Sequence, residues 1–335
     1  MKNILTGLVR RNEFGIFLAL LALAGVVAAL NPQAFFQSYS LNLWLFSLSL
    51  IGLVAIGQTL VILTGGIDLG SGSLIALSGV VCALLVNYLG GGWTGVLGAY
   101  AITCGMGALI GLYHAFYITR LGVPPFIITL GTLIMARGVA ELITRGRTIS
   151  GMPPEFHLLG GSGSVHVPFL PFLPPAAVLF TIIAVAAALI TNRTALGRRI
   201  YAVGGNPEAA RLSGVNNARV IAFCYAASGF LGALAGVVYA SNVTIGDPKA
   251  GFAYELTAIA AVVIGGASLM GGVGTVLGSV LGAAIMSLLP LGLTYLRFES
   301  WWQSIATGLV VVLAVTLDAY RRKRRVAVRI RSQKE

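Results

Sequence analysis

Charged residues are scarce in this sequence, and acidic ones are the scarcest. Together they make up 10% of the 335 residues, against about 25% in a typical soluble domain. Several uninterrupted apolar stretches are long enough for the roughly 20-residue helix that crosses a bilayer. The alternation of apolar and polar residues that a membrane β-barrel needs is missing, which leaves helices as the spanning elements. We therefore expect an all-α polytopic membrane protein.

Cysteine and histidine are also rare, with three of each. The cysteines lie far apart inside apolar runs, at Cys82, Cys104 and Cys224. This spacing predicts neither a disulfide framework nor a metal site, and no HExxH pattern appears. Catalytic dyads and activated nucleophiles are not visible either. We therefore expect no catalytic residue and no metal ion, which disfavours a membrane-embedded enzyme.

The net charge is +12, and the basic residues gather in a few loops and at the carboxyl end. Basic residues collect on the cytoplasmic side of membrane proteins, so this charge does not require a nucleic-acid partner. The distribution predicts that both termini and the loop 192–217 face the cytoplasm. The tail 321–335 is expected to anchor the topology and to touch anionic membrane lipid.

About ten apolar stretches are candidate spans. They lie at about 14–30, 42–64, 70–89, 94–119, 125–144, 172–191, 218–241, 254–269, 271–293 and 301–320. The third and eighth are flanked by glycine-rich breaks, and either can be a half-helix, so the count is eight to ten. We expect one transmembrane domain over 14–320, between a cytoplasmic segment 1–13 and the basic tail.

The loop 192–217 contains signals for a short helix within the stretch GRRIYAVGGNPEAARLSGV (197–215). Asn206 is a favoured N-cap residue, because its side chain can accept a bond from a free amide of the first turn. Pro207 suits the first helical position, where no amide hydrogen is needed. The helix is therefore predicted to begin at Pro207.

The same stretch contains signals for the other end of this helix. Glu208 and Arg211 carry the charges that the helix dipole favours at the start and the end. Gly214 suits the left-handed residue that follows the last turn. The pattern predicts a helix over 207–213.

Two helical turns are marginal in water, so this helix must pack against something. Its exposed groups are expected to be small, at Ala209, Ala210 and Ser213. Small groups allow the groove of another protein to approach the backbone closely. We therefore favour a docking element for a cytoplasmic partner over an amphipathic helix that merely lies on the lipid surface.

Four stretches carry a family resemblance. The stretch 197–215 resembles the cytoplasmic loop of the ribose-type permease subunits of ATP-binding-cassette (ABC) importers. AIGQTLVILTGGIDLGSGSLIALSG (55–79) and GFAYELTAIAAVVIGGASLMGGVGTVLGSVLGA (251–283) resemble the two most recognisable motifs of that family. ATGLVVVLAVTLD (306–318) is similar to its last span. The resemblance covers the chain from about 15 to 320.

The resemblance implies a type II-like ABC importer permease in a bacterial inner membrane. It implies a cytoplasmic ATPase subunit, often with two nucleotide domains in one chain, that binds ATP and Mg²⁺ and grips the loop helix. A periplasmic sugar-binding protein would deliver substrate to the outer segments 145–171 and 242–253, and a second permease copy or a paralogue would complete the pathway. This chain itself would be a transport subunit without catalysis or cofactor.

The ATPase-coupling residues implied by the resemblance surround the loop helix. They are Gly197, Gly205, Asn206, Pro207, Glu208, Ala209, Ala210, Arg211, Leu212, Ser213 and Gly214. The stretch follows an apolar run and precedes another. It is therefore the segment through which force from the ATPase is expected to pass.

LTGGIDLGSGS places a carboxylate among glycines between two apolar runs. Asp68 is expected to cap a helix that starts near Leu69, with support from Ser71. The broken segment can also line the translocation path and expose backbone groups to a polar solute. The candidate path residues are Gly65, Gly66, Asp68, Ser71, Gly265 and Gly266.

A second glycine-rich stretch, VVIGGASLMGGVGTVLGSVLGA, has glycines at every fourth position, at Gly274, Gly278 and Gly282. This small-xxx-small pattern predicts close helix packing in a membrane. The stretch lacks the Lys-Ser/Thr ending of a phosphate-binding P-loop. We therefore expect the chain not to bind ATP and to depend on a partner for energy.

The few charges inside the predicted spans are expected to be structural. Arg137 and Glu141 are four residues apart on one predicted helix, which predicts an ion pair. Glu255 lies at the start of the eighth predicted span. Its negative charge is expected to interact favourably with the positive end of that helix dipole at the outer interface.

The main alternative is a secondary transporter driven by protons or sodium. Ion coupling usually needs acidic residues or histidine inside the membrane, and this chain offers few beyond Asp68, Glu141, Glu255 and His114. Permeases for branched-chain amino acids or nucleosides belong to the same superfamily and stay open. A monosaccharide of the ribose type is the expected cargo, with rhamnose or an autoinducer-2-like sugar also compatible.

Overall fold

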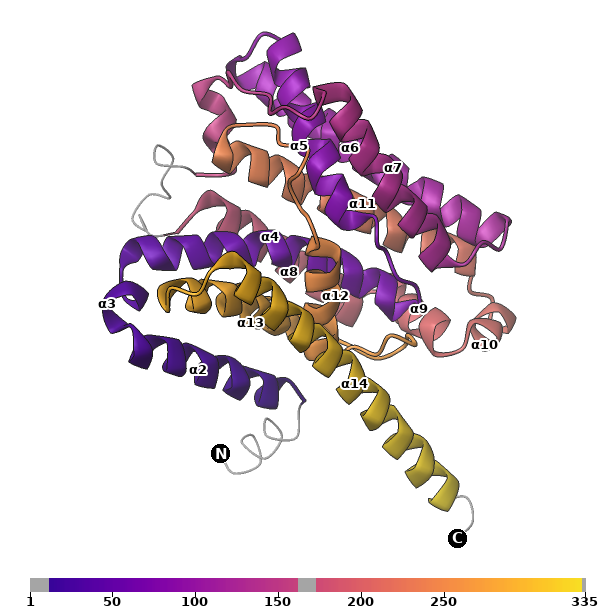
Figure 1. Ribbon diagram of the computed structural model, residues 1–335. Coiled ribbons are helices and arrows are strands. Elements are labelled where there is room, and N and C mark those ends of the chain that lie inside the picture. The colour runs from indigo at the N-terminus through magenta and orange to yellow at the C-terminus, as the bar shows by residue number, and fades with distance from the viewer. Residues whose placement is uncertain (1–11, 162–172, 333–335) are drawn as a thin grey trace.

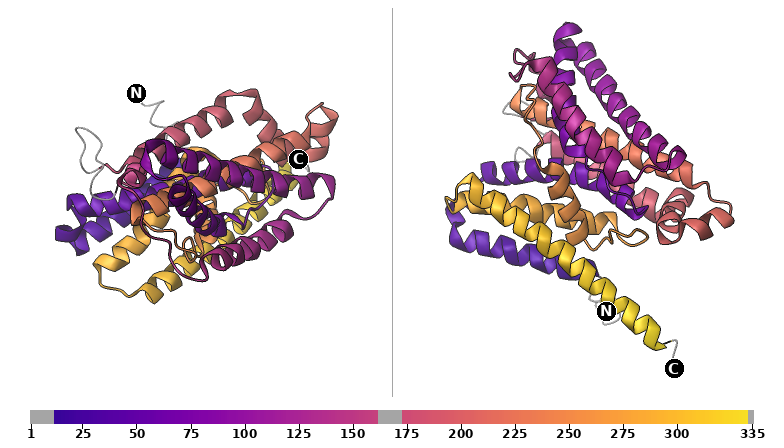
Figure 2. Two further views of the ribbon diagram at one scale, coloured as in Figure 1. Left: turned by 90° about the horizontal axis from the view of Figure 1, so that it is seen from above. Right: turned by 45° about the vertical axis from the view of Figure 1, so that its right-hand side comes forward.

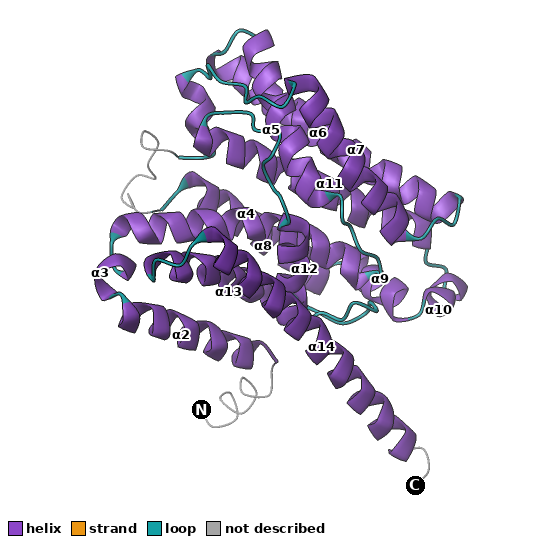
Figure 3. Ribbon diagram, viewed as in Figure 1, coloured by secondary structure: helices purple, strands orange, loops and turns teal. Residues whose placement is uncertain are grey.

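The computed structural model describes residues 12–161 and 173–332, where the regular elements are helices (Figure 1; Figure 3). They are α2 (Asn12–Leu30), α3 (Pro32–Phe35), α4 (Ser38–Leu63), α5 (Ser71–Tyr88), α6 (Gly92–Arg120), α7 (Pro125–Thr144), the 3₁₀ helix η1 (Pro154–Leu158), α8 (Pro175–Arg193), α9 (Ala195–Gly205), α10 (Pro207–Leu212), α11 (Asn217–Val243), α12 (Tyr254–Ile264), α13 (Val276–Tyr295) and α14 (Ser300–Ser332). Parts of the predicted amino-terminal segment, outer loop 145–171 and tail lie outside the described residues.

Eight helices are long and apolar enough to cross a membrane: α2, α4, α5, α6, α7, α8, α11 and α13. The span expected at 254–269 is wrong, because α12 has 11 residues and reaches about 16 Å, roughly half of the hydrocarbon core. In α14, the apolar part Ser300–Thr316 is also a shorter apolar helix. The expected span at 70–89 forms a full-length helix, α5. The count of ten spans therefore becomes eight.

The helices form two groups with α12 between them. In Figure 1, α5, α6, α7 and α11 form the upper group, and α2, α4, α8, α13 and α14 form the lower group. The groups are joined because α11 packs against α4 as well as against α5 and α6. We call the end where α9 and α10 lie the α10 end and the opposite end, with α3 and η1, the α3 end (Figure 2).

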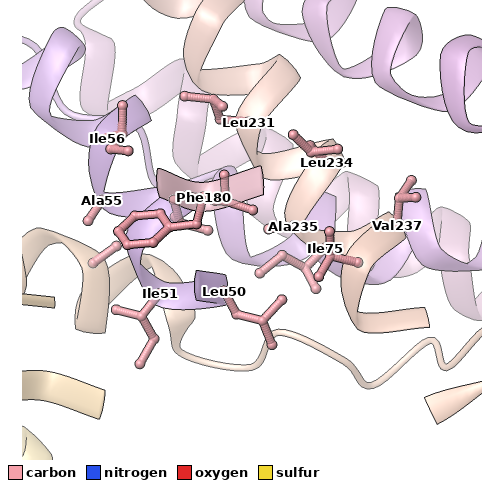
Figure 4. Packing of buried hydrophobic residues seen from close by; sticks show 14 of the residues in the cluster. Leu50, Ile51, Ala55, Ile56, Ile75, Phe180, Leu231, Leu234, Ala235 and Val237 are labelled. Atoms are coloured by element: carbon pink, nitrogen blue, oxygen red, sulfur yellow. The ribbon is translucent and has the colours of Figure 1, made fainter. Parts of the chain in front are cut away.

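The core is apolar and draws most of its residues from the second half of α4 and from α5, α11 and α12. Ile51, Ile56, Phe180 and Leu231 are among its buried side chains (Figure 4). Lipid tails are as apolar as leucine, so burial of such side chains does not by itself hold helices together in a membrane. Close packing between helix backbones must contribute.

Glycines provide that close packing. A Cβ atom on Gly229 of α11 would overlap the carbonyl oxygen of Gly107 on α6, so the two backbones touch there. The predicted small-xxx-small face is confirmed in α13, where a Cβ on Gly278 or Gly282 would overlap the backbone of α12. Gly274 lies outside this face, because it precedes the helix and has φ of +147°.

Candidate functional site

The short helix predicted in the loop 192–217 is present as α10. The side chain of Asn206 accepts a hydrogen bond of 3.0 Å from the amide of Ala209, and Pro207 is the first residue. The helix ends at Leu212, one residue earlier than predicted, and Gly214 follows with the expected left-handed φ of +82°. Its caps and its stop are therefore local features that the sequence pattern dictates.

Charges on the surface of α10 reinforce the helix. Arg211 and Glu208 form an ion pair of 2.6 Å with both side chains about two-thirds exposed. The hydrogen bond from Arg211 to this carboxylate raises the pKa of Arg211 above its ordinary value. An exposed pair of this kind is screened by water and adds little to helix stability. Its main effect is to hold the two side chains in one arrangement.

The exposed surface of α10 differs from the prediction at one position. Ala209 and Ser213 are exposed as expected, but Ala210 is only 4% exposed. It packs in a buried cluster with Ile200 of α9 and with residues of α4 and α11. Leu212 instead projects outward and is 76% exposed. Leu212 is among the coupling residues that the family resemblance implies, and a single exposed leucine is by itself no docking signal.

Further contacts fasten α10 to its neighbours. The side-chain amide of Asn217 donates to the carbonyl of Pro207 over 2.8 Å. The preceding helix α9 is capped by Thr194, whose hydroxyl accepts from the amide of Gly197 over 3.2 Å. A Cβ on Gly197 would overlap the backbone of α8, which explains glycine at this bend, whereas a Cβ on Gly205 would point into open space. These contacts make α9 and α10 an ordered unit.

The end of α9 touches both glycine-rich breaks through its backbone. A Cβ on Gly204 would overlap the carbonyl oxygen of Leu63, at the end of α4, and would approach the amide of Gly272. Gly272 in turn donates to that same carbonyl of Leu63 over 2.9 Å. We call the contact between Leu63, Gly204 and Gly272 the glycine junction. It joins the loop helices to the break after α4 and to the turn between α12 and α13.

Side chains brace the same turn. The hydroxyl of Tyr201 on α9 donates to the carbonyl of Gly274 over 2.8 Å. Thr275, the N-cap of α13, donates to the carboxylate of Glu13 on α2 over 2.9 Å. Burial raises the pKa of Tyr201 above its ordinary value, and the nearby Glu13 charge adds to this. Helix α9 is therefore bound to the turn through both backbone and side chains.

Asp68 lies in the break between α4 and α5 and is completely buried. The predicted N-cap position is wrong, because α5 begins at Ser71 and its N-cap residue is Gly70, without a side-chain cap. The expected backbone amide bond to the carboxylate is confirmed. One carboxylate oxygen of Asp68 accepts from the amide of Gly70 over 3.0 Å. The other accepts from the hydroxyl of Ser228, on α11, over 2.7 Å. The carboxylate therefore fastens the break to α11.

Other polar side chains complete this buried cluster. The side-chain amide of Gln58 on α4 donates to the backbone carbonyl of Asp68 and, over 3.1 Å, to the hydroxyl of Ser71. His114 on α6 lies with its Nδ1 atom 3.9 Å from Asp68, and its Nε2 atom is 2.8 Å from the hydroxyl of Thr132 on α7. The break is thus linked to α4, α6, α7 and α11. Gln58 and Ser228 are ordinary polar residues in apolar runs, and no local pattern marks them as partners of the break.

The glycines proposed for the translocation path are packed against protein. Gly65 has φ of +82° and Gly266 has φ of +89°, values that favour glycine. A Cβ on Gly66 would overlap the hydroxyl of Tyr225. A Cβ on Gly265 would meet the backbone of Gly278 at 2.5 Å. The described contacts explain these glycines by chain reversal and close packing, and their place in the path stays a prediction.

The predicted ion pair between Arg137 and Glu141 does not form among the described side chains. Arg137 instead donates to the carbonyls of Pro248 (3.2 Å) and Ala250 (2.7 Å), in the segment that leads into α12. Glu141 is exposed. Helical spacing allowed the pair, but the approach of the segment gave the guanidinium closer acceptors.

Glu255 lies in the first turn of α12, where its charge favours the positive end of the helix dipole as predicted. Its side chain is only 8% exposed. Its carboxylate lies against Gly72 at the start of α5, and Oε2 has no hydrogen-bond partner. This reflects the path of segment 244–253, which runs along α5 so that Gly251 touches Ile75.

A bundle of membrane-crossing helices, with a half-length helix and an ordered loop helix at one end, is the architecture of a polytopic membrane transport protein. The family model for the branched-chain amino acid transport system / permease component matches residues 40–315. The chain belongs to this family. No solved structure matches it.

Relatives within the family are sugar import permeases. The ribose import permease of Haemophilus influenzae is 38% identical over 91% of this chain and 92% of its own length. The autoinducer 2 import system permease of Yersinia enterocolitica is 35% identical over 95% and 84%, and the galactose/methyl galactoside import permease of Escherichia coli is 35% identical over 93% and 96%. The resemblance to ribose-type ABC importer permeases is confirmed, and with it a transport subunit for monosaccharides in a membrane.

Proposed function

We propose that this chain is the permease subunit of an ATP-driven importer in a bacterial inner membrane. It carries a monosaccharide of the ribose type, or a rhamnose or autoinducer-2-like sugar, delivered by a periplasmic binding protein. The α10 end and both termini face the cytoplasm, in agreement with the excess of basic residues there. A cytoplasmic ATPase subunit, with two nucleotide domains, binds ATP and Mg²⁺, and a second permease copy or a paralogue completes the pathway.

The observation that carries this proposal is the glycine junction. The loop helices are packed against the rest of the chain, because Gly204 contacts Leu63 and Gly272 through backbone atoms. A push on Leu212 and the exposed face of α10 therefore moves α9, and α9 moves the end of α4 together with the turn between α12 and α13. Protein interiors are close-packed and transmit such displacements. Energy released on the ATPase would reach both broken segments in this way.

The loops at the α3 end are suited to docking of a binding protein. There the loop after α7 and the loop after α11 are joined, because Ile149 and Gly246 exchange backbone hydrogen bonds of 2.9 and 2.8 Å. Phe156 of η1 is buried, and its carbonyl accepts from Tyr100 and Ser241. These ties give the outer loops a defined shape, which a docking partner requires.

The first experiment isolates tagged protein from its native membranes in mild detergent and identifies the proteins bound to it. Leu212→Arg and Ala209→Arg change the exposed face of α10, whereas Ala210 is buried and unsuitable. Leu121→Arg is the control, because this exposed leucine also lies at the α10 end but outside the loop helices. We expect a tandem ATPase to accompany the wild type and the control and to be lost from both α10 variants.

A second experiment separates this function from the alternatives. Vesicles with the reconstituted complex, the binding protein and internal ATP are tested with labelled ribose, galactose, a branched-chain amino acid and a nucleoside. ATP-dependent uptake of a monosaccharide supports the proposal. Uptake that needs no ATP and is abolished by a protonophore would instead indicate an ion-coupled transporter. ATP-dependent uptake of the amino acid or the nucleoside would show that the cargo is not a monosaccharide.

A further inference from the structure

We propose that the groove between α6 and the start of α11 is a binding site for an anionic glycerophospholipid. The lipid comes from the leaflet at the α10 end. The groove borders α10 through Arg211 and Gly214, but Leu212 and the residues of the glycine junction do not line it. The proposal does not depend on which solute the protein carries.

The groove consists of two adjoining hollows that share Thr119, Asn216 and Ala218. The hollow along α6 has a volume of about 340 Å³ and is also lined by Phe116 and Arg219. The hollow toward α10 has about 620 Å³. Both are open at the surface, so a flexible chain can enter them from the side.

The α10 end of the groove is positively charged. Arg120 closes α6, Arg219 lies in the first turn of α11, and both are exposed and line the smaller hollow. Arg211 lines the larger one but is already paired with Glu208, so the free positive charge of the groove comes from Arg120 and Arg219. No acidic side chain lines either hollow, and among the described side chains neither Arg120 nor Arg219 has an ion pair. Planar guanidinium groups suit a phosphate, which they bind through paired hydrogen bonds.

The smaller hollow is apolar along α6, where Leu112 and Phe116 line it. They are 44% and 54% exposed, and Leu109, which is 66% exposed, lies beyond the hollow on the same face of α6, which ends at Arg120. We call Leu109, Leu112 and Phe116 the apolar stripe. From Arg120 to Leu109 the helix rises about 16 Å, close to the hydrocarbon thickness of one leaflet. The stripe lies within a candidate membrane span.

This combination selects the occupant. A cytoplasmic protein can reach the arginines but not an apolar stripe that extends into the bilayer. Free phosphate binds the arginines but makes no apolar contact with the stripe. A phospholipid offers an anionic headgroup and an acyl chain at the corresponding distance. Basic pockets between membrane helices bind such headgroups in general. Charge and depth together therefore favour an anionic lipid over both alternatives.

The test measures lipid binding directly on the full-length protein in detergent by native mass spectrometry. Phosphatidylglycerol and phosphatidylcholine are titrated separately, and inorganic phosphate is added as a competitor. We expect one tight phosphatidylglycerol site with roughly 30-fold higher affinity than for phosphatidylcholine, because Arg120 and Arg219 each contribute about 1 kcal/mol near a headgroup. Displacement by millimolar phosphate would show an anion site without a lipid and would overturn the proposal.

Variants locate the site. The double substitution Arg120→Gln with Arg219→Gln should remove the preference for phosphatidylglycerol. Phe116→Ser alone should lower the binding affinity for both lipids. Arg198→Gln with Arg199→Gln is the control, because it removes the same charge from exposed residues of α9 that line neither hollow. Equal loss in the control would indicate diffuse attraction and overturn the site.

A last measurement tests whether a second copy covers the groove instead. Phe116→Cys is introduced into the full chain, and membranes are treated with an oxidant. Efficient cross-linking of two copies through this position would place a protein, not a lipid, on the stripe and would overturn the proposal. We expect no cross-link, and labelling by a lipid-borne thiol reagent. This readout remains available if the double arginine variant fails to fold.

Discussion

The amide of Gly272 donates a hydrogen bond to the carbonyl of Leu63 over 2.9 Å, and Gly204 fills the space beside it without a Cβ atom. This bond connects two breaks that are about 200 residues apart along the chain. It lies beneath the loop helices, where a displacement of α9 acts on both. The mechanical role of this contact can be tested by glycine-to-alanine substitutions, each of which adds a single methyl group.

Gly204→Ala adds a Cβ that would overlap the carbonyl oxygen of Leu63, and the backbone atoms there cannot move aside. We expect a loss of about 1–3 kcal/mol of stability, as for other overpacked sites, and loss of ATP-driven uptake. Melting of the detergent-solubilised protein and vesicle uptake measure the two effects.

The matched control is Gly205→Ala, because nothing lies within 4 Å of a Cβ at that position. It should change stability by less than about 1 kcal/mol, the range of helix propensity. If both variants behave alike, the glycine junction has no special role.

Tyr201→Phe removes one hydrogen bond, the one to Gly274, and should cost about 1 kcal/mol. The comparison is Tyr88→Phe, in which the side chain is 85% exposed and little change is expected. Thermal unfolding in detergent at neutral pH measures the difference.

The contribution of Tyr201 also depends on pH. Because burial raises its pKa above the ordinary value of 10.0, the folded state favours the protonated hydroxyl. Its stabilising effect is present below pH 10 and is lost as the pH rises through the raised pKa. The stability gap between wild type and Tyr201→Phe should therefore narrow above pH 10. A gap that widens would contradict the hydrogen bond as the cause.

Ser228→Ala leaves the buried carboxylate of Asp68 without its donor from α11. We expect a cost of about 1.5–3 kcal/mol, as for a hydrogen bond to a charged group. Ser49→Ala is the control, since this buried serine donates within its own helix, to Leu45, and should cost less than about 1 kcal/mol. A double-mutant cycle with Asp68→Asn isolates the pair, and additive effects would show that the two residues are not coupled.

Arg137→Gln removes the donor that holds the carbonyls of Pro248 and Ala250. Stability should fall by about 2 kcal/mol, and the backbone of segment 244–253 should exchange hydrogen faster. Glu141→Gln should stay within about 0.5 kcal/mol, because the side chain is exposed and makes no ion pair in the described residues. Equal effects of both variants would contradict this arrangement and support the ion pair between Arg137 and Glu141 that their spacing predicts.

Local chemistry in the sequence determined much of this protein. Apolar length defined most spans, and the caps of α10 followed from Asn206, Pro207 and Gly214, whose interactions reach only three or four residues along the chain. The close packing of α13 was likewise visible in the spacing of Gly278 and Gly282. Such features are predictable because the interacting groups are held together by the geometry of one helix.

The tertiary structure alone decided which distant groups meet. Asp68 pairs with Ser228 across 160 positions, Tyr201 reaches Gly274 across 73, and Arg137 turns from Glu141 to a segment 111 or more positions away. Ala210 is buried rather than exposed because α9 and α11 pack over it. Helical periodicity gives the direction of a side chain but not what lies there, and in this protein the packing of separate helices supplied the partner.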